Sequence, residues 1–405
     1  MKRAQKPLSL AEFTMMIAMM ISIVAMATDI MLPALGVIGD ELRVADPNDA
    51  QLIISSLFVG FAVGQLFAGP LSDSIGRKPT IYAGYVVFVI GCVLSVMAGN
   101  LETMLAGRVL QGLGAAPARV ITVAIVRDSY EGRPMARVMS IVMAVFILVP
   151  AIAPSIGQGL ILAFPWQSTF IFLALNAVLC FVWFGLRQAE TLLPEHRRPF
   201  SVTAILSGIR VFFGYRAAVG YTVSAGIVFG AFIGYLSSAQ QIFQTTYDLG
   251  EMFPIYFGIA ALAIGAASVT NSKLVMRLGM RYLSHRGLIG VTFLGAALLI
   301  PAAVQWQGVP PLWMFMAWLL PTFFCVGILF GNFNALAMEP LGQMAGLGAA
   351  LVGALQSFIS IPLGWAVGNF YDGTVLPLVG GFALLGAMSL LMMTWTERKA
   401  ATRPA

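Results

Sequence analysis

Twelve long apolar runs constrain this chain more than any other feature of its sequence. A bilayer core about 30 Å thick needs roughly 20 apolar residues per helix, and each run is about that long. Of the 405 residues, 59% are hydrophobic and only 10% are charged, which is too much apolar surface for a water-soluble fold. Lipid offers no hydrogen-bond partner to the backbone, so a segment that crosses a bilayer must satisfy its own polar groups. Long continuous apolar runs do so as helices. The predicted spans are 13–36, 51–72, 80–98, 101–127, 136–161, 166–186, 217–244, 252–272, 283–304, 311–337, 345–370 and 375–396.

The basic residues predict the orientation of these spans. With a cytoplasmic N-terminus, all of the 23 Lys and Arg residues except Arg43, Arg108 and Arg119 fall in the tails or at the inner loops. This asymmetry places both termini in the cytoplasm and predicts a multi-pass protein of a bacterial inner membrane. The first span is too long for a signal-peptide core, so we expect it to stay in the mature protein. The net charge of +6 then reflects topology, and nucleic-acid binding is not expected.

The chain divides into two halves at its longest internal hydrophilic segment. We expect an N-terminal six-helix bundle over 1–186, a cytoplasmic linker over 187–216 and a C-terminal six-helix bundle over 217–405. From Phe200 onward the linker has apolar residues at a spacing that suits a helix lying on the inner membrane surface.

The second half weakly repeats the first. A shift of 203 residues lays "LSDSIGRK" (71–78) over "LVMRLGMR" (274–281), and both stretches join the second and third spans of their halves. The sequence therefore predicts an all-α integral membrane protein, with twelve transmembrane helices arranged as two six-helix repeats around a central cavity.

Four stretches of sequence resemble a known family. The turn "GPLSDSIGRKP" (69–79) resembles the signature between the second and third helices of the major facilitator superfamily. "RVLQG" (108–112) resembles the fourth-helix motif of that superfamily's proton-driven drug antiporters, "AIVRD" (124–128) closes the same span, and Asp29 precedes "LP" in the first span. Together these stretches resemble the bicyclomycin-resistance branch of twelve-span drug/proton antiporters, over nearly the whole chain.

The resemblance implies that the turn is a gate at the cytoplasmic surface. Its residues are Gly69, Asp73, Gly76, Arg77 and Lys78, with Asp128 at the end of the fourth span. Asp73 would face the N-terminus of the eleventh span near Gly346, Arg77 would pair with Asp128, and the cluster would hold the outward-open state. The alternative is that Arg77 and Lys78 only set the topology.

Three ionisable residues lie well inside spans, where a charge is expensive and marks a functional candidate. Asp29 is the expected proton site, together with Arg108, although a buried ion pair that only fixes helix packing stays open. Arg119 lies eleven residues after Arg108 and so returns to nearly the same helix face, close to Gln111. Arg119 could attract anionic substrates, organise the inner gate or serve packing.

The fifth span carries "VPAIAPSIGQGL" (149–160), which resembles the antiporter motif of drug exporters, with departures at Ala153 and Gln158. Its Pro and Gly residues allow a bend and a close contact between the halves. The candidates are Pro150, Pro154, Gly157 and Gly159.

The substrate cavity is expected to be apolar and aromatic with a few polar groups, which suits small amphiphilic compounds. Its candidates are Arg119, Gln111, Tyr235, Gln241, Tyr256, Asn332, Asn334 and Gln356. The sequence contains no nucleotide-binding loop, catalytic triad or metal-ligand spacing, so we expect neither an enzyme nor a metal site.

These features predict a proton-coupled antiporter that exports small amphiphilic compounds by alternating access. No cofactor is expected, because the proton gradient supplies the energy. The expected partners are the substrate, protons and the lipid bilayer, and the expected state is a monomer. Three alternatives stay open: a proton-coupled uptake symporter, an exporter of one endogenous metabolite or siderophore, and a transport-inactive membrane sensor or assembly partner.

Overall fold

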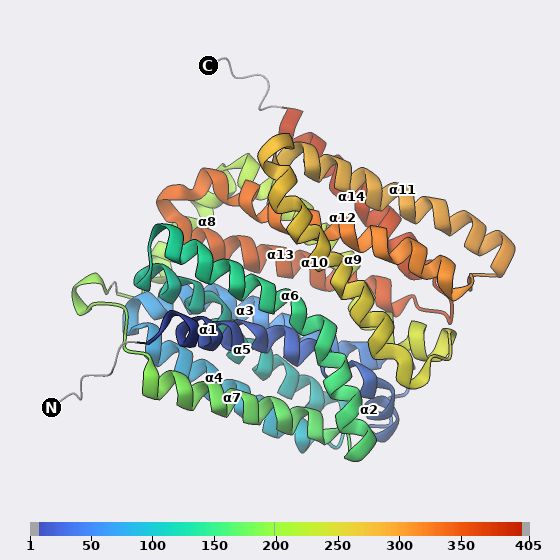
Figure 1. Ribbon diagram of the computed structural model, residues 1–405, viewed down its shortest axis with the longest axis horizontal. Coiled ribbons are helices and arrows are strands. Elements are labelled where there is room, and N and C mark those ends of the chain that lie inside the picture. Colours follow the sequence, from blue (N-terminus) through green and yellow to red (C-terminus); the bar gives the residue numbers. More distant parts are fainter. Residues whose placement is uncertain (1–7, 198, 399–405) are drawn as a thin grey trace. The chain divides into compact units, whose positions relative to one another are not determined.

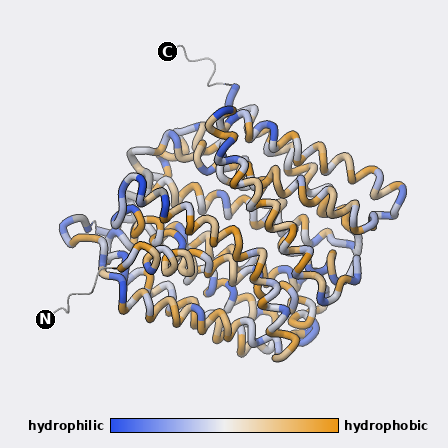
Figure 2. The backbone as a smooth tube through the Cα atoms, viewed as in Figure 1, coloured by the Kyte–Doolittle hydropathy of each residue, from blue (hydrophilic) through white to orange (hydrophobic). Residues whose placement is uncertain are grey.

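The computed structural model describes residues 8–197 and 199–398, and this part of the chain is helical throughout, without a β-strand. It contains twelve helices that are long and apolar enough to cross a membrane. The predicted all-α fold with twelve spans is therefore confirmed. Figure 2 shows the physical basis, because hydrophobic residues dominate along the long helices and hydrophilic residues gather at their ends and connections.

The chain forms two compact units. Unit 1 comprises Met1–Arg43 and Ser56–Thr203, and unit 2 comprises Val44–Ser55 and Ala204–Ala405. The linker expected over 187–216 is thus shared between the units. A difference from the expected halves is that a short segment containing the start of the second span, Val44–Ser55, belongs to the unit of the C-terminal helices.

Unit 1 contains the first six spans, drawn from blue to green in Figure 1. Its elements are α1 (Leu10–Asp29), the 3₁₀-helix η1 (Leu32–Ala34), α2 (Leu35–Glu41), α3 (Leu52–Ile75, from Ser56 onward), α4 (Arg77–Val96), α5 (Leu101–Ser129), α6 (Gly132–Ala163), α7 (Gln167–Arg187) and η3 (Pro194–His196). The first span is the most deeply buried, since 83% of its most apolar window lies inside the protein. Accordingly α1 packs against α5, α6 and α7, while α4 packs against α5 and α7.

Unit 2 contains the last six spans. Its elements are η2 (Pro47–Gln51), α8 (Val202–Gly214, from Ala204 onward), α9 (Arg216–Gln240), the π-helix η4 (Gln241–Thr246), η5 (Gly250–Met252), α10 (Phe253–Leu278), α11 (Met280–Trp306), α12 (Leu312–Met338), η6 (Glu339–Met344), α13 (Ala345–Asn369) and α14 (Leu376–Arg398). Helix α9 is the central one and packs against α12, α13 and α14, while α11 packs against α12 and α14.

Helix α8 corresponds to the helix expected on the inner membrane surface, although it begins after Phe200. Phe212 is buried, whereas Leu206, Val211 and Phe213 are exposed. One face of α8 therefore packs on the rest of unit 2, and the other face exposes apolar side chains, as in helices that lie in a membrane interface.

The two units share one local feature that supports the weak sequence repeat. Gly76, between α3 and α4, has a φ of 112°, and Gly279, between α10 and α11, has a φ of 79°. Side chains disfavour this backbone region, so glycine is the residue that allows both sharp turns. The 203-residue shift pairs these two glycines.

Candidate functional site

The interior of unit 1 contains a buried charge pair. Asp29 is the last residue of α1 and its residue surface is 3% exposed, while Arg108 on α5 is 0% exposed. The two charges interact electrostatically. A buried carboxylate and a buried guanidinium are each costly alone, and their attraction offsets part of that cost.

Neighbouring helices hold the Arg108 guanidinium in place. It donates a 2.7 Å hydrogen bond to Gln111 Oε1, and its central carbon lies 5.8 Å from the centre of the Phe170 ring on α7. Gln111 in turn donates to the Ser95 hydroxyl at 2.9 Å and to the Gly91 carbonyl at 3.3 Å, both on α4. The Gln111 amide therefore links Arg108 to α4 through hydrogen bonds. Its part in the substrate cavity stays a prediction.

The fifth span reaches Asp29 through Gly157. A Cβ atom built at Gly157 would overlap the carbonyl oxygen of Ile30, the residue after Asp29, so only glycine allows α6 to approach α1 so closely. A Cβ atom built at Gly159, two residues later, would lie in open space. Pro150 and Pro154 lie within α6, which runs without interruption from Gly132 to Ala163. The described contact of Gly157 is thus inside unit 1, where the sequence suggested a contact between halves.

The turn at Gly76 begins a network of charges at the end of unit 1 where α3 and α4 meet. The Arg77 guanidinium donates to Asp73 at 2.5 Å, to Ser72 at 2.7 Å and to Asp128 at 3.2 Å. Asp128 is the partner that the family resemblance implies for Arg77. Gly69 has open space around it, and the contact expected between Asp73 and the eleventh span stays a prediction.

Two further parts of this network were missed by the sequence analysis. The Glu190 carboxylate accepts hydrogen bonds of 3.0 Å from the backbone N–H groups of Arg77 and Lys78, at the start of α4. The Lys78 ammonium donates to the Gly185 and Gln188 carbonyls at 2.8 and 2.6 Å, at the end of α7. An acid therefore stabilises one helix N-terminus and a cation stabilises one C-terminus, as the helix dipoles favour.

Arg119 lies on α5, and its guanidinium carbon is 4.9 Å from the centre of the Phe146 ring on α6. A cation held over an aromatic face is stabilised where little water reaches it. The contact accounts for how unit 1 accommodates this charge and leaves its part in substrate binding a prediction.

The aromatic candidates of unit 2 lie in one cluster. Tyr235 stacks on Phe257 with ring centres 5.6 Å apart and meets the edge of Phe323 at 4.7 Å. Tyr256 stacks on Phe243 at 6.2 Å. Tyr235, Phe257 and Phe323 are buried against one another, and a part for these aromatic rings in a substrate cavity stays a prediction.

The remaining amide candidates are spread over unit 2. Asn332 exchanges hydrogen bonds of 2.9 and 3.1 Å with Asn271, so this pair satisfies itself. Asn334 is exposed and donates to the carbonyl of Phe330, and Gln356 is half-buried.

Gln241 belongs to a group that includes the start of the second span. Gln51 donates to Gln241 Oε1 at 2.6 Å and to the Gly368 carbonyl at 3.1 Å. A Cβ atom at Gly368 would overlap the Gln51 amide oxygen, so the Gln51 side chain can take this position because residue 368 is glycine. Gln241 is also the first residue of a π-helix, a local irregularity that is frequent at functional sites.

The same group, the outer amide cluster, includes two further residues. Asn48 donates to the carbonyls of Asn369 and Tyr371 at 3.2 and 3.0 Å and accepts from Gln241 at 3.0 Å. The Tyr371 hydroxyl donates to the Gln241 carbonyl at 3.2 Å, and burial raises the pKa of this phenol. Asn48 and Gln51 were missed by the sequence analysis; the signal available was two amides at the start of an apolar run.

Comparison with known proteins agrees with this architecture. The family model described as Major Facilitator Superfamily matches residues 8–364. The chain is 27% identical over 374 residues to a bicyclomycin resistance protein homolog of Haemophilus influenzae, covering 90% of this chain and 92% of that one. It is 28% identical over 380 residues to the multidrug resistance protein MdtL of Vibrio parahaemolyticus, covering 91% of each.

The fold is also that of a solved transporter. The crystal structure of a D-xylose-proton symporter aligns with a TM-score of 0.75 at 14% identity, covering 95% of this chain and 97% of that one. The twelve membrane helices, the turn at Gly76 and the family match lead to one conclusion: the chain belongs to the Major Facilitator Superfamily of membrane transporters.

Proposed function

We propose that this protein is a proton-driven antiporter that exports small amphiphilic compounds from a bacterial cell. The observation that carries the proposal is the buried pair of Asp29 and Arg108 in unit 1. Its relatives named bicyclomycin resistance protein homolog and multidrug resistance protein support the class of substrate.

Proton coupling follows from the cost of an uncompensated charge. When Asp29 takes up a proton, the Arg108 guanidinium stays buried without its counter-charge, which destabilises that state of the protein. A conformation that brings water or a substrate dipole near Arg108 is then favoured. Loss of the proton on the cytoplasmic side restores the pair, so proton uptake and release drive alternating access.

The rest of the molecule is assigned in the same proposal. The aromatic cluster around Tyr235 provides apolar walls for the cargo, and Arg119 and the amides of unit 2 add polar contacts. The turn cluster around Arg77 stabilises one end state at the cytoplasmic surface. Both termini lie in the cytoplasm, the protein acts as a monomer, and the proton gradient is its energy source.

Drug susceptibility in a bacterium that lacks its own exporters tests the proposal. Cells that produce the protein are expected to tolerate amphiphilic drugs better than cells with an empty vector, and to hold less of a fluorescent drug. A protonophore should remove this difference, because the gradient drives export. Cells that accumulate the compound, or protection that survives the protonophore, would contradict proton-driven export.

A further inference from the structure

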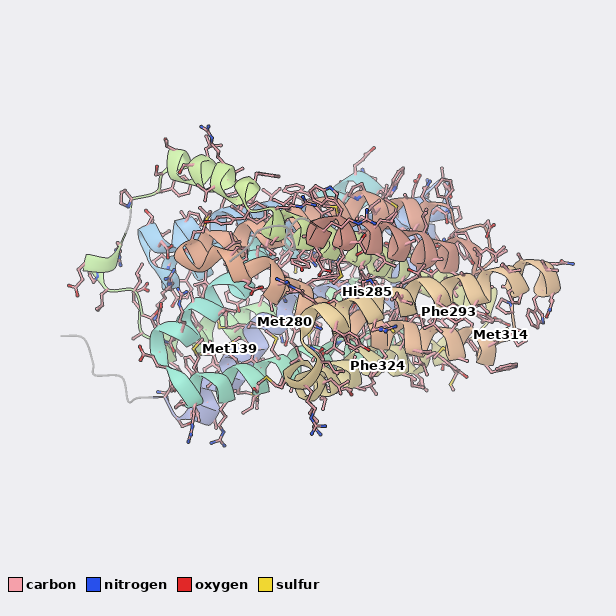
Figure 3. All side chains as sticks on the ribbon, turned by 90° about the horizontal axis from the view of Figure 1, so that it is seen from above. Met139, Met280, His285, Phe293, Met314 and Phe324 are labelled. Atoms are coloured by element: carbon pink, nitrogen blue, oxygen red, sulfur yellow. The ribbon has the colours of Figure 1, made fainter. Side chains whose placement is uncertain are left out.

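The cytoplasmic end of unit 2 has an open pocket that plays no part in the proposed transport cycle. Its volume is about 370 Å³ and it lies where α11 begins and α14 ends. Five side chains line it: Arg281, Tyr282, His285, Arg286 and Glu397. Figure 3 shows His285 on α11, between Met280 and Phe293.

The charges of this pocket are unbalanced toward the positive. Two arginines face one carboxylate, and that carboxylate, Glu397, also accepts a 2.9 Å hydrogen bond from the Tyr221 hydroxyl. Arg281 reaches Glu339 only at 3.9 Å, and their side chains are 57% and 60% exposed, so water weakens this pair. Arg286 lies over the Tyr282 ring, 5.2 Å from its centre. The pocket therefore has room and positive charge for an anion.

The corresponding turn of unit 1 shows what unit 2 lacks. The 203-residue shift pairs Lys78 with Arg281. In unit 1 the Arg77 guanidinium meets Asp73 and Asp128, Lys78 donates to carbonyls at the end of α7, and Glu190 accepts from the backbone N–H groups. In the described part of unit 2, the ion pair of this turn is the exposed one between Arg281 and Glu339. The second copy keeps one cation of the turn, Arg281 in the place of Lys78, and Arg286 adds another, while the acid Glu339 is exposed, which leaves a place for a negative group beside the two arginines.

The surroundings of the pocket are those of a lipid headgroup region. Tyr282 and Trp395 are exposed aromatic residues at the ends of α11 and α14, and Arg216 stacks on Trp395 at 3.9 Å. Tyr and Trp gather at the level of the headgroups. Further along the same helices, Phe293 and Leu391 present apolar surface outward, as acyl chains require. A phosphate bound at the pocket would thus have its lipid tails beside apolar side chains.

We propose that this pocket binds the phosphate of an anionic phospholipid from the cytoplasmic leaflet. Arg281 and Arg286 hold the phosphate oxygens, and Tyr282 lies at its side. Basic pockets between membrane helices on the cytoplasmic side are suited to such headgroups. The lipid supplies the missing negative charge and stabilises the end of α11 against α14.

Native mass spectrometry of the purified full-length protein tests this site. The probes are phosphatidylglycerol and phosphatidylcholine, offered together in mixed micelles. Wild-type protein is expected to prefer phosphatidylglycerol, and Arg281→Gln and Arg286→Gln should each lower that preference about fivefold. Arg277→Gln is the matched control, because Arg277 is an exposed arginine at the same end of unit 2 that does not line the pocket, and it should keep the preference.

A further variant tests the pocket even if the arginine variants fail to fold. Glu397→Gln removes the acid of the pocket and keeps a hydrogen-bond acceptor for Tyr221, so the phosphatidylglycerol preference should rise. The thermal midpoint, measured with phosphatidylglycerol or with inorganic phosphate, separates the two sources of phosphate; the lipid should raise it more. Equal binding of both lipids by the wild type, an unchanged preference in both arginine variants, or equal stabilisation by inorganic phosphate would overturn the proposal.

Discussion

The lack of a Cβ atom at Gly157 allows the end of α1 to pack closely against α6. The Cα position of Gly157 faces the carbonyl of Ile30, so any added methyl group would push α6 away from α1 at the residue next to Asp29. We expect the interaction between Asp29 and Arg108 to depend on this approach, because a hydrogen bond to Gln111 holds the Arg108 guanidinium.

Gly157→Ala is therefore expected to lower drug export about tenfold or more at equal protein level, because it displaces Asp29 from Arg108. Gly159→Ala, in the same helix with open space around it, should leave export nearly unchanged. Efflux of a fluorescent drug from cells measures both. Equal activity of the two variants would show that the contact with Ile30 does not position Asp29.

Sequence reasoning found these residues by different routes. Asp29 and Arg108 could be predicted because a charge inside an apolar span has no structural reason to be there unless it is paired. Gly157 was singled out through its motif, while its neighbour Ile30 could not be foreseen. The contact joins residues far apart in the chain, and only the packing of α6 on α1 brings them together.

At the scale of the elements, the ends of α4 and α7 are joined by reciprocal caps. Glu190 covers the first N–H groups of α4, and Lys78 covers the last carbonyls of α7. Each helix end has unsatisfied backbone groups that a side chain of the opposite segment satisfies. The start of the linker is thereby fixed to the turn that contains Arg77.

Replacing Glu190 with alanine should lower the stability of unit 1 by about 1 kcal/mol, because two backbone donors and a helix dipole lose their acceptor. The measurement is the thermal midpoint of purified protein in detergent. Glu195→Ala changes an exposed acid of the same linker and should leave the midpoint unchanged. Equal midpoints for both variants would show that the cap does not stabilise the protein.

The elements themselves were largely predictable and their caps were not. Twelve apolar runs gave twelve spans with ends close to those observed, because hydrophobic length in a bilayer leaves few alternatives. The bond from Arg77 to Glu190 crosses 113 residues of sequence, and no periodicity reports such a contact. The outer amide cluster is similar, since Gln51 meets Gln241 across 190 residues.

At the scale of the whole molecule, the two units differ in chemistry. Unit 1 holds the buried charges Asp29 and Arg108, whereas the described interior of unit 2 is aromatic and amide-rich around Tyr235 and Gln241. The sequence predicted this division, because mid-span charges occur in the first half alone. In our account proton binding therefore belongs to unit 1.

The central claim is that Asp29 carries the transported proton. Everted membrane vesicles with an imposed pH gradient test it, because addition of an exported drug should release protons through the wild-type protein and reduce the gradient. Asp29→Asn should lower this release to the level of vesicles without the protein, whereas Asp40→Asn, at an exposed aspartate of α2, should behave as wild type. Drug-induced proton release by Asp29→Asn at the wild-type rate would contradict the account.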